Sequence, residues 1–196
     1  MARERVKIDK NTQIKIANNL VGSFYYGHER MMRDIEFREL GEDDYISFEE
    51  LSLIKSKSKS VLQDMMIVIS DVDDDEVTVA DVLEALKLTA IYNDYKKLVG
   101  VDEGENLDGR ELLGLFKLDA DEFEDIFKPN KDKRNPMTPQ LRTQIAKLAV
   151  HLYKEGELSR GIERVIEDVL KESKVKLGLF REIDDRKDAS EKRNRY

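Results

Sequence analysis

The chain has 196 residues, enough for one domain or one domain with an appendage, and its 40% apolar residues support a real core rather than disorder. Charged residues make up 39% of the chain beside only three prolines and ten glycines, a composition typical of long amphipathic helices with charged solvent faces. The absence of cysteine excludes disulfides, thiolate metal sites and cysteine nucleophiles.

The net charge of −8 is unevenly distributed along the chain. Residues 128–196 contain 18 Lys and Arg against 12 Asp and Glu, whereas residues 1–127 contain 16 against 30. An acidic body joined to a basic C-terminal third can attract partners of either sign, or a neighbouring copy of itself. The alternative explanation is that both charge sets are solvated helix faces.

No targeting or membrane segment is visible in the sequence. The N-terminus begins with charged residues and no apolar stretch follows, so it does not resemble a secretory signal. The best apolar run, 65–69, is far shorter than the roughly 20 residues of a spanning helix. We therefore expect no membrane contact and a location in the cytoplasm or within a virus particle, not secretion.

The N-terminal region is predicted to form helices. In residues 12–26, Ile16, Leu20 and Phe24 recur every four residues, which indicates one apolar helix face. Residues 28–40 are interpreted as a second helix.

A capping box, Ser47-Phe-Glu-Glu50, predicts the start of a helix that continues to Ile69. Two alternatives stay open because Ile67–Ile69 is β-branched. They are a loop at 55–60 followed by a strand at 65–70, and a short β-hairpin at 65–79.

Three further helix starts follow in chain order. Thr78 is expected to cap a helix that runs to Val99 and stops at Gly100. Two Asp-x-x-Glu arrangements, starting at Asp108 and Asp119, predict two short helices.

The C-terminal third predicts a helical hairpin. Thr138-Pro139 combines a capping hydroxyl with proline at the first helical position. Gly156 separates this helix from a second one, and both carry apolar residues at offsets of four, seven and eight. Two such helices joined by a short turn form an antiparallel pair.

These elements predict an all-α fold, an irregular helical bundle ending in the antiparallel hairpin. The expected organisation is an acidic helical body (1–127), a basic linker (128–136), the hairpin (137–180) and a charged tail (181–196).

Metal binding and catalysis find little support. Asp71, Asp73 and Asp75 fit the first ligand positions of a calcium loop, but Glu76 and Val82 replace the glycine and the bidentate carboxylate. The three aspartates are weak calcium candidates, and no cofactor is predicted. Neither a Gly-x-Ser-x-Gly elbow nor a phosphate-binding glycine loop is present, so we expect no enzyme. The two histidines, His28 and His151, are interpreted as surface residues.

Basic clusters suggest one possible role in nucleic-acid binding. Phosphate contact needs such clusters, and the strongest one precedes the hairpin: Lys128, Lys131, Lys133 and Arg134. Lys55, Lys57 and Lys59 form a second basic run, and the tail adds more cations. A nucleic-acid-associated regulator using the 128–134 loop and the tail is therefore the alternative function.

Protein–protein assembly is the leading hypothesis. Aromatic residues and methionine are favoured at interfaces, and two adjacent pairs stand out: Tyr25, Tyr26, Met31 and Met32. The chain is predicted to be a non-enzymatic adaptor or structural subunit, within an oligomer or larger complex of protein chains. Its small, charged, motif-poor character resembles that of phage accessory or virion proteins.

Overall fold

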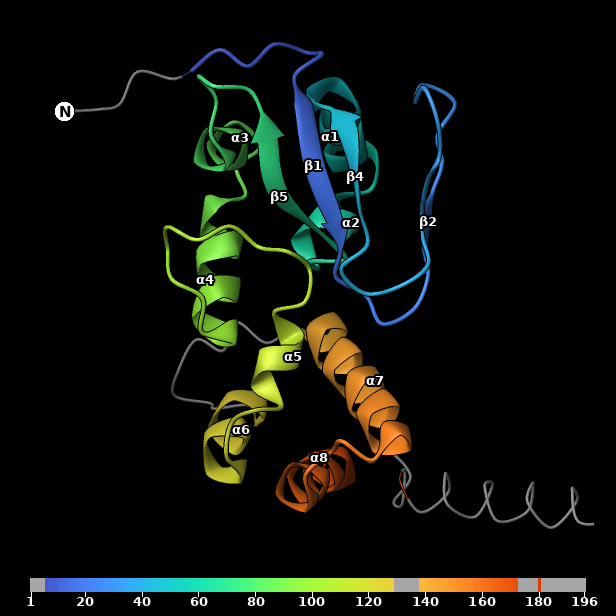
Figure 1. Cartoon of the computed structure of the whole chain (residues 1–196), viewed down its shortest axis with the longest axis vertical. Coiled ribbons are helices and arrows are strands. Elements are labelled where there is room, and N and C mark those ends of the chain that lie inside the picture. Colours follow the sequence, from blue (N-terminus) through green and yellow to red (C-terminus); the bar gives the residue numbers. More distant parts are fainter. Residues whose placement is uncertain (1–5, 129–137, 173–179, 181–196) are drawn as a thin grey trace, which may run out of the picture. The chain divides into compact units, whose positions relative to one another are not determined.

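The computed structural model describes residues 6–128, 138–172 and 180 (Figure 1). It divides the chain into two compact units, residues 1–114 and residues 115–196. The expected basic linker, except for Lys128, and the whole charged tail at 181–196 lie outside the described residues.

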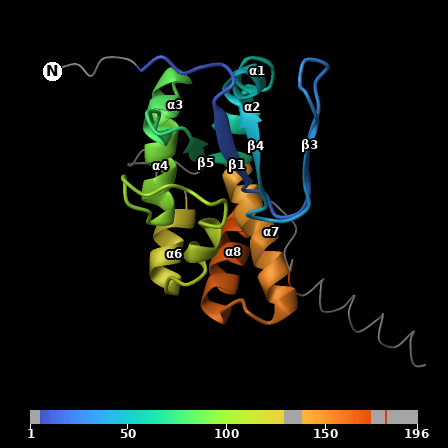
Figure 2. The same cartoon turned by 45° about the horizontal axis from the view of Figure 1, so that its top comes forward.

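The first unit contains β-sheet, so the all-α helical bundle is wrong. A three-stranded antiparallel sheet has the order β4-β1-β5, with β1 at Gln13–Asn18, β4 at Asp43–Ser47 and β5 at Ile67–Asp73. A separate antiparallel pair consists of β2 (Phe24–Tyr26) and β3 (Ile35–Phe37). This pair and its loop, residues 24–37, are called the arm, and both views show it standing apart from the face of the three-stranded sheet (Figures 1 and 2).

Strand β1 replaces the first predicted helix because its side chains alternate. Ile14 and Ile16 are fully buried, whereas Gln13 is exposed and Lys15 is half-buried. Ile14 lies opposite Ile46 of β4, and the paired strands bury the same face. Of the three residues whose recurrence suggested a helix, only Ile16 belongs to β1, because Leu20 follows the strand and Phe24 lies in β2. The recurrence therefore does not describe one face of a single element.

Two helices follow β4. The capping box at Ser47 is confirmed and opens α1 (Phe48–Lys57). The helix does not reach Ile69, because it ends at Ser58 and a second short helix, α2 (Lys59–Gln63), follows. A turn with Met65 at φ 53° then leads into β5.

The β-branched run at 67–69 therefore forms a strand, as the first alternative expected. The loop that this alternative placed at 55–60 is wrong, because the segment forms the end of α1 and the start of α2. The short hairpin within 65–79 is nevertheless wrong, because β5 pairs with β1, far away in the sequence. Ile69 lies opposite Ile16 of β1, and both side chains are fully buried.

The long helix predicted from Thr78 is two helices, α3 (Val79–Ala85) and α4 (Thr89–Val99). Thr78 forms the expected cap and Gly100, with φ 72°, ends α4. The break lies at Lys87, whose φ of 56° is incompatible with a continuous right-handed helix.

The buried Asn18 joins three segments at the end of β1. Its side-chain amide donates to the carbonyl oxygens of Leu20 at 3.2 Å, Gly22 at 2.9 Å and Glu39 at 2.8 Å. The backbone carbonyl oxygen of Asn18 accepts the N–H of Gly41 at 2.7 Å. The segments that lead into and out of the arm are therefore tied to one side chain and its backbone.

The side chain of the neighbouring Asn19 also joins segments that are distant in the sequence. Its amide donates to the carbonyl of Met65 at 2.9 Å, and its oxygen accepts the hydroxyl of Tyr95 at 3.0 Å. Because Tyr95 belongs to α4, this residue links β1, the turn before β5 and a helix that follows much later.

The second unit is helical. It contains α6 (Ala120–Phe127), α7 (Pro139–Glu155) and α8 (Arg160–Glu172), and the short α5 (Leu112–Leu115) ends where this unit begins. Helices α6 and α8 approach closely at Gly161, since a Cβ there would lie 2.8 Å from the Cβ of Ala120. Phe123 and Phe127 stack at 5.3 Å within α6.

The predicted caps and stop of the C-terminal helices are present. Thr138 Oγ1 accepts the N–H of Leu141 at 3.1 Å, and Gly156 ends α7 with φ 78°. Asp119 caps α6 through the N–H of Glu122. Among the described residues no helix is long and apolar enough to cross a membrane.

Replacing Asn18 with alanine should destabilise the first unit. The substitution leaves three loop carbonyl oxygens without their donor, and we expect a loss of about 3 kcal/mol in the free energy of unfolding. Chemical denaturation checks this. The exposed Asn106, replaced by alanine, is the control and should change stability by less than about 0.5 kcal/mol.

Gly109→Ala should be costly because Gly109 has φ 83° and a Cβ there would lie 2.5 Å from the carbonyl oxygen of Asn18. We expect a loss above about 2 kcal/mol in denaturant titration. Gly104→Ala is the matched control, since a Cβ at Gly104 meets no atom within 4 Å and its φ is not left-handed. Equal stability of the two variants would contradict the close approach.

Candidate functional site

The arm has one buried and one exposed face. Phe24 lies opposite Phe37, and their rings stack at 6.2 Å on the buried side. Tyr25 lies between Phe24 and Tyr26 on the strand, so its side chain points the other way and is 66% exposed. Strand alternation therefore explains why Tyr25 is exposed.

Tyr25 is held in place by the arm itself. Its hydroxyl donates to Asp34 Oδ2 at 2.6 Å, and this bond raises the pKa of the tyrosine. Gly27 makes room for the pair, because a Cβ there would lie 2.6 Å from Asp34 Oδ1 and 2.9 Å from the Tyr25 hydroxyl. The exposed ring therefore has a defined position.

Met32, near the tip of the arm, is anchored through its backbone. Its N–H donates to Glu50 Oε1 at 2.9 Å. Glu50 is only 8% exposed, and its Oε2 accepts the N–H and the hydroxyl of Ser47, both at 2.9 Å. One carboxylate thus completes the capping box of α1 and fixes the arm.

Opposing effects act on the pKa of Glu50. Burial raises it, but the hydrogen bonds from Ser47 and Met32 and the positive charge of Arg33 outweigh burial, so the pKa lies below its ordinary value. Glu50 is therefore charged at neutral pH, as the three hydrogen bonds that it accepts require.

The four partner-binding candidates fall into two groups. The Met32 side chain is 93% exposed although its backbone is fixed, and Tyr25 is also exposed. Tyr26 and Met31 are half-buried. The arm thus presents two large apolar side chains to solvent.

A surface depression of about 400 Å³ lies beside Met32. It lies between residues 11–13, the arm and α1, and most of the residues that line it have polar side chains; they include Asn11, Gln13, Arg30, Ser52, Leu53 and Ser56. An exposed apolar group next to a polar hollow combines the two surface types found at the centre and the rim of protein interfaces.

At each edge strand of the three-stranded sheet, a side chain forms a hydrogen bond with a backbone group of the strand. At β4, Arg33 donates to the carbonyl of Tyr45 at 3.1 Å and pairs with Asp44 at 2.6 Å. At β5, the N–H of Ile69 donates to the buried Tyr92 hydroxyl at 2.7 Å. These contacts disfavour the addition of a foreign strand to the sheet, and Arg33 also ties the arm to β4.

The calcium candidates lie at the end of β5 and in the turn after it. Asp71, Asp73 and Asp75 are all exposed. Within the described part of the chain, no group of three or more His, Cys, Asp or Glu side chains is placed to hold a metal ion. His151 is exposed, and His28 Nδ1 accepts the N–H of Arg30 at 3.2 Å.

Of the nucleic-acid candidates, only Lys128 is described, and it pairs with Glu124 one helical turn earlier. Lys131, Lys133 and Arg134 lie outside the described residues.

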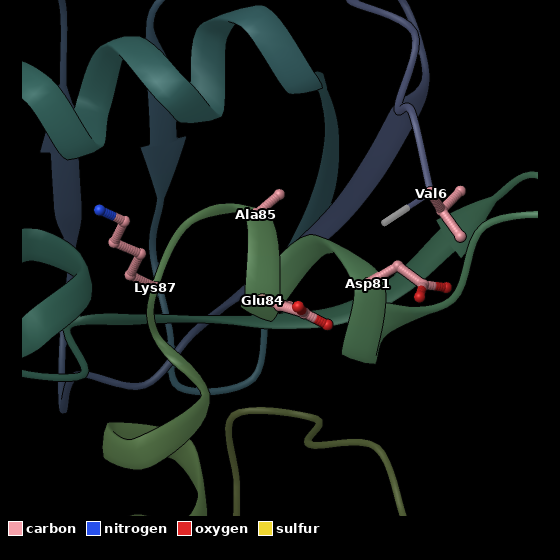
Figure 3. A pocket seen from close by; sticks show the side chains of 5 residues that line it. All are labelled: Val6, Asp81, Glu84, Ala85 and Lys87. Carbon is pink, nitrogen blue, oxygen red and sulfur yellow. The ribbon is translucent and has the colours of Figure 1, made fainter. Parts of the chain in front are cut away.

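A second pocket, of about 120 Å³, lies in the first unit (Figure 3). Asp81, Glu84 and Lys87 line it together with Val6 and Ala85. In Figure 3 the Lys87 amine points away from the carboxylates of Asp81 and Glu84.

Three residues that position the candidate surface were not singled out as such from the sequence. Glu50 was recognised as a capping residue, but its bond to Met32 depends on a contact across 18 residues. Arg33 and Asn18 carry no sequence signal that separates them from the chain's other arginines and asparagines. Their roles follow from the strands that surround them.

No protein-family model, curated protein or solved structure compared with this chain matches it significantly.

Glu50→Gln should weaken both the α1 cap and the anchoring of Met32, because an amide nitrogen cannot accept the hydrogen bonds that one carboxylate oxygen receives. We expect a loss of about 1–3 kcal/mol in unfolding free energy above pH 5. The folded pKa of Glu50 is lowered, so its contribution is present above the unfolded pKa and is lost as the pH falls through the folded value.

The measurement is denaturant unfolding of wild type and variant between pH 3 and 7, roughly the range in which carboxylates titrate. The difference should be largest near neutrality and shrink in acid. Glu49→Gln, an exposed neighbour, is the control and should shift stability by less than about 0.5 kcal/mol. A Glu50→Gln deficit that stays constant with pH would refute this role of the carboxylate.

Proposed function

We propose that the chain is a non-enzymatic adaptor or structural subunit that binds other protein chains in a larger assembly, such as a virus particle, and that the arm is its contact surface. The single observation that supports this proposal best is Met32, 93% exposed on a backbone tethered to a buried carboxylate. Methionine adapts its shape to apolar partners and is frequent at binding surfaces.

The anchoring of the arm favours binding. Association costs free energy whenever a mobile loop becomes ordered. Here Asn18 ties the ends of the arm, Arg33 ties its middle to β4, and Glu50 ties the backbone at Met32. The exposed Tyr25 and Met32 are therefore already positioned, and less ordering remains to be done when a partner binds.

The surroundings of Met32 specify the chemistry of the partner. An apolar patch on the partner would cover Met32 and the Tyr25 ring, while polar groups at its rim would meet the amides and hydroxyls of the adjacent depression. Main-chain pairing with the sheet is not required, which agrees with the contacts that occupy both sheet edges.

The test uses the full chain with a photo-crosslinking residue at position 32 or, as control, at the exposed Ala90 of α4. Partners captured from the native source through position 32 are identified by mass spectrometry, and their affinity is then measured with purified proteins. A second copy of the chain is one acceptable partner.

Met32→Asp should weaken that affinity at least about tenfold, equivalent to roughly 1.4 kcal/mol, because it places a charge at the centre of the contact. Ala90→Asp adds the same charge elsewhere and should leave the affinity unchanged. Equal binding by both variants, or cross-linking at position 90 but not at 32, would overturn the arm as the contact surface.

A further inference from the structure

Met32 differs from the other methionines that the structure describes in how far solvent reaches it. Met32 is 93% exposed, whereas Met31 and Met66 are half-buried and Met65 is only 4% exposed. A peroxide oxidises methionine at the thioether sulfur, and the reagent has to reach that sulfur. Among the described methionines, Met32 is therefore the one most accessible to an oxidant.

The tether of the arm keeps Met32 in this exposed position. Its N–H donates to Glu50 Oε1 at 2.9 Å, and Glu50 is itself bound to the helix cap at Ser47. The next residue, Arg33, pairs with Asp44 of β4 at 2.6 Å. Because the backbone is held on both residues, the thioether cannot move into the core of the first unit unless these contacts break.

Oxidation by hydrogen peroxide would convert the Met32 thioether into a sulfoxide. The sulfur lone pair attacks one peroxide oxygen, so that an S–O bond forms while the O–O bond breaks, and the other oxygen leaves as water after proton transfer. The sulfur loses two electrons and the peroxide gains them. The product is polar, since its oxygen accepts hydrogen bonds, whereas the thioether is apolar.

The fold can accommodate a sulfoxide at position 32. The contact with Glu50 is made by the backbone N–H, which oxidation of the side chain does not change. The adjacent depression also carries groups able to donate hydrogen bonds to a sulfoxide oxygen: Asn11, Gln13, Arg30 and Ser52. The same reaction at the buried Met65 would leave an acceptor in the core, where an unpaired polar atom is costly.

We infer that reversible oxidation of Met32 regulates the contact made by the arm, so that the thioether binds the apolar patch of the partner and the sulfoxide does not. This inference rests on the proposed function, because it assigns a regulatory reaction to the same surface. An apolar patch offers no donor to the sulfoxide oxygen, and burying a polar group without a hydrogen bond costs free energy.

The reaction is reversible by a known class of enzyme and acts on the free chain. Methionine sulfoxide reductases return the thioether while a dithiol is oxidised to a disulfide and the oxygen leaves as water. In the proposed complex the partner covers Met32, so peroxide cannot reach its sulfur. Oxidation would therefore prevent assembly, and a bound partner should protect Met32.

The first experiment maps the oxidation of the full chain by limiting hydrogen peroxide. Samples are quenched at intervals, digested, and analysed by mass spectrometry for the sulfoxide fraction at each methionine. Met32 should react at least about tenfold faster than Met65, and faster than Met31 and Met66, because susceptibility follows exposure. The chain that carries a sulfoxide at Met32 should keep the denaturation midpoint of the untreated chain.

The second experiment uses phenyl-substituted agarose as a probe of exposed apolar surface, followed by the purified partner captured through position 32. Peroxide should make the wild-type chain elute earlier from the resin. Peroxide should also weaken binding of the partner at least about tenfold, the scale expected for the loss of one buried apolar side chain. Reductases for both sulfoxide epimers should restore the retention and the affinity.

Two variants assign these effects to one sulfur, and each is compared with its own untreated sample. Met32→Leu cannot form the sulfoxide, so peroxide should change its retention and affinity much less than those of wild type. Met66→Leu is the matched control, since it removes a different methionine and should respond to peroxide as the wild-type chain does.

Three results would overturn the inference. They are slower oxidation of Met32 than of Met31 or Met66, unchanged affinity after full conversion of Met32, and an equal response of wild type and Met32→Leu to peroxide. In each case a partner captured through position 32 would still support the proposed function. Failure of the proposed function has a different signature, which is the absence of any partner cross-linked at position 32, and it would overturn the inference as well.

Discussion

The hydrogen bonds of Asn18 are the constraint on which the first unit depends. A single buried amide binds carbonyl oxygens from both sides of the arm, and the backbone carbonyl of the same residue accepts from Gly41. Gly109 packs against this carbonyl from a third segment. Buried carbonyls that lack donors are costly, so the ends of the arm, the end of β1 and the 108–111 turn hold their positions together.

The arm is also fixed at two further points, and a charged side chain makes the contact at each. Arg33 binds Asp44 and the carbonyl of Tyr45, and the carboxylate of Glu50 binds the N–H of Met32. The polar contacts hold the backbone, which leaves the side chains of Tyr25 and Met32 exposed to solvent. An apolar group on a fixed backbone is an arrangement typical of binding surfaces, where order gained in advance reduces the cost of association.

Contacts at the arm would be dominated by the burial of apolar area, which salt does not weaken. This surface belongs to the unit formed by residues 1–114.

The sequence by itself determined the helix caps, because these depend on residues three or four positions apart. Ser47, Thr78, Asp119 and Thr138 cap helices as expected, and Gly156 ends one. The sequence also showed the adjacent pairs Tyr25-Tyr26 and Met31-Met32. It did not show which member of each pair is exposed to solvent.

The tertiary structure decided the strands and the geometry of the arm. β1 forms a strand because Ile14 and Ile16 lie opposite residues of β4 and β5, which are distant in the sequence. The long helix predicted from Thr78 is interrupted at Lys87, whose left-handed backbone is not indicated by the residues beside it in the sequence. Contacts between distant residues carry this information, and a sequence read locally does not contain it.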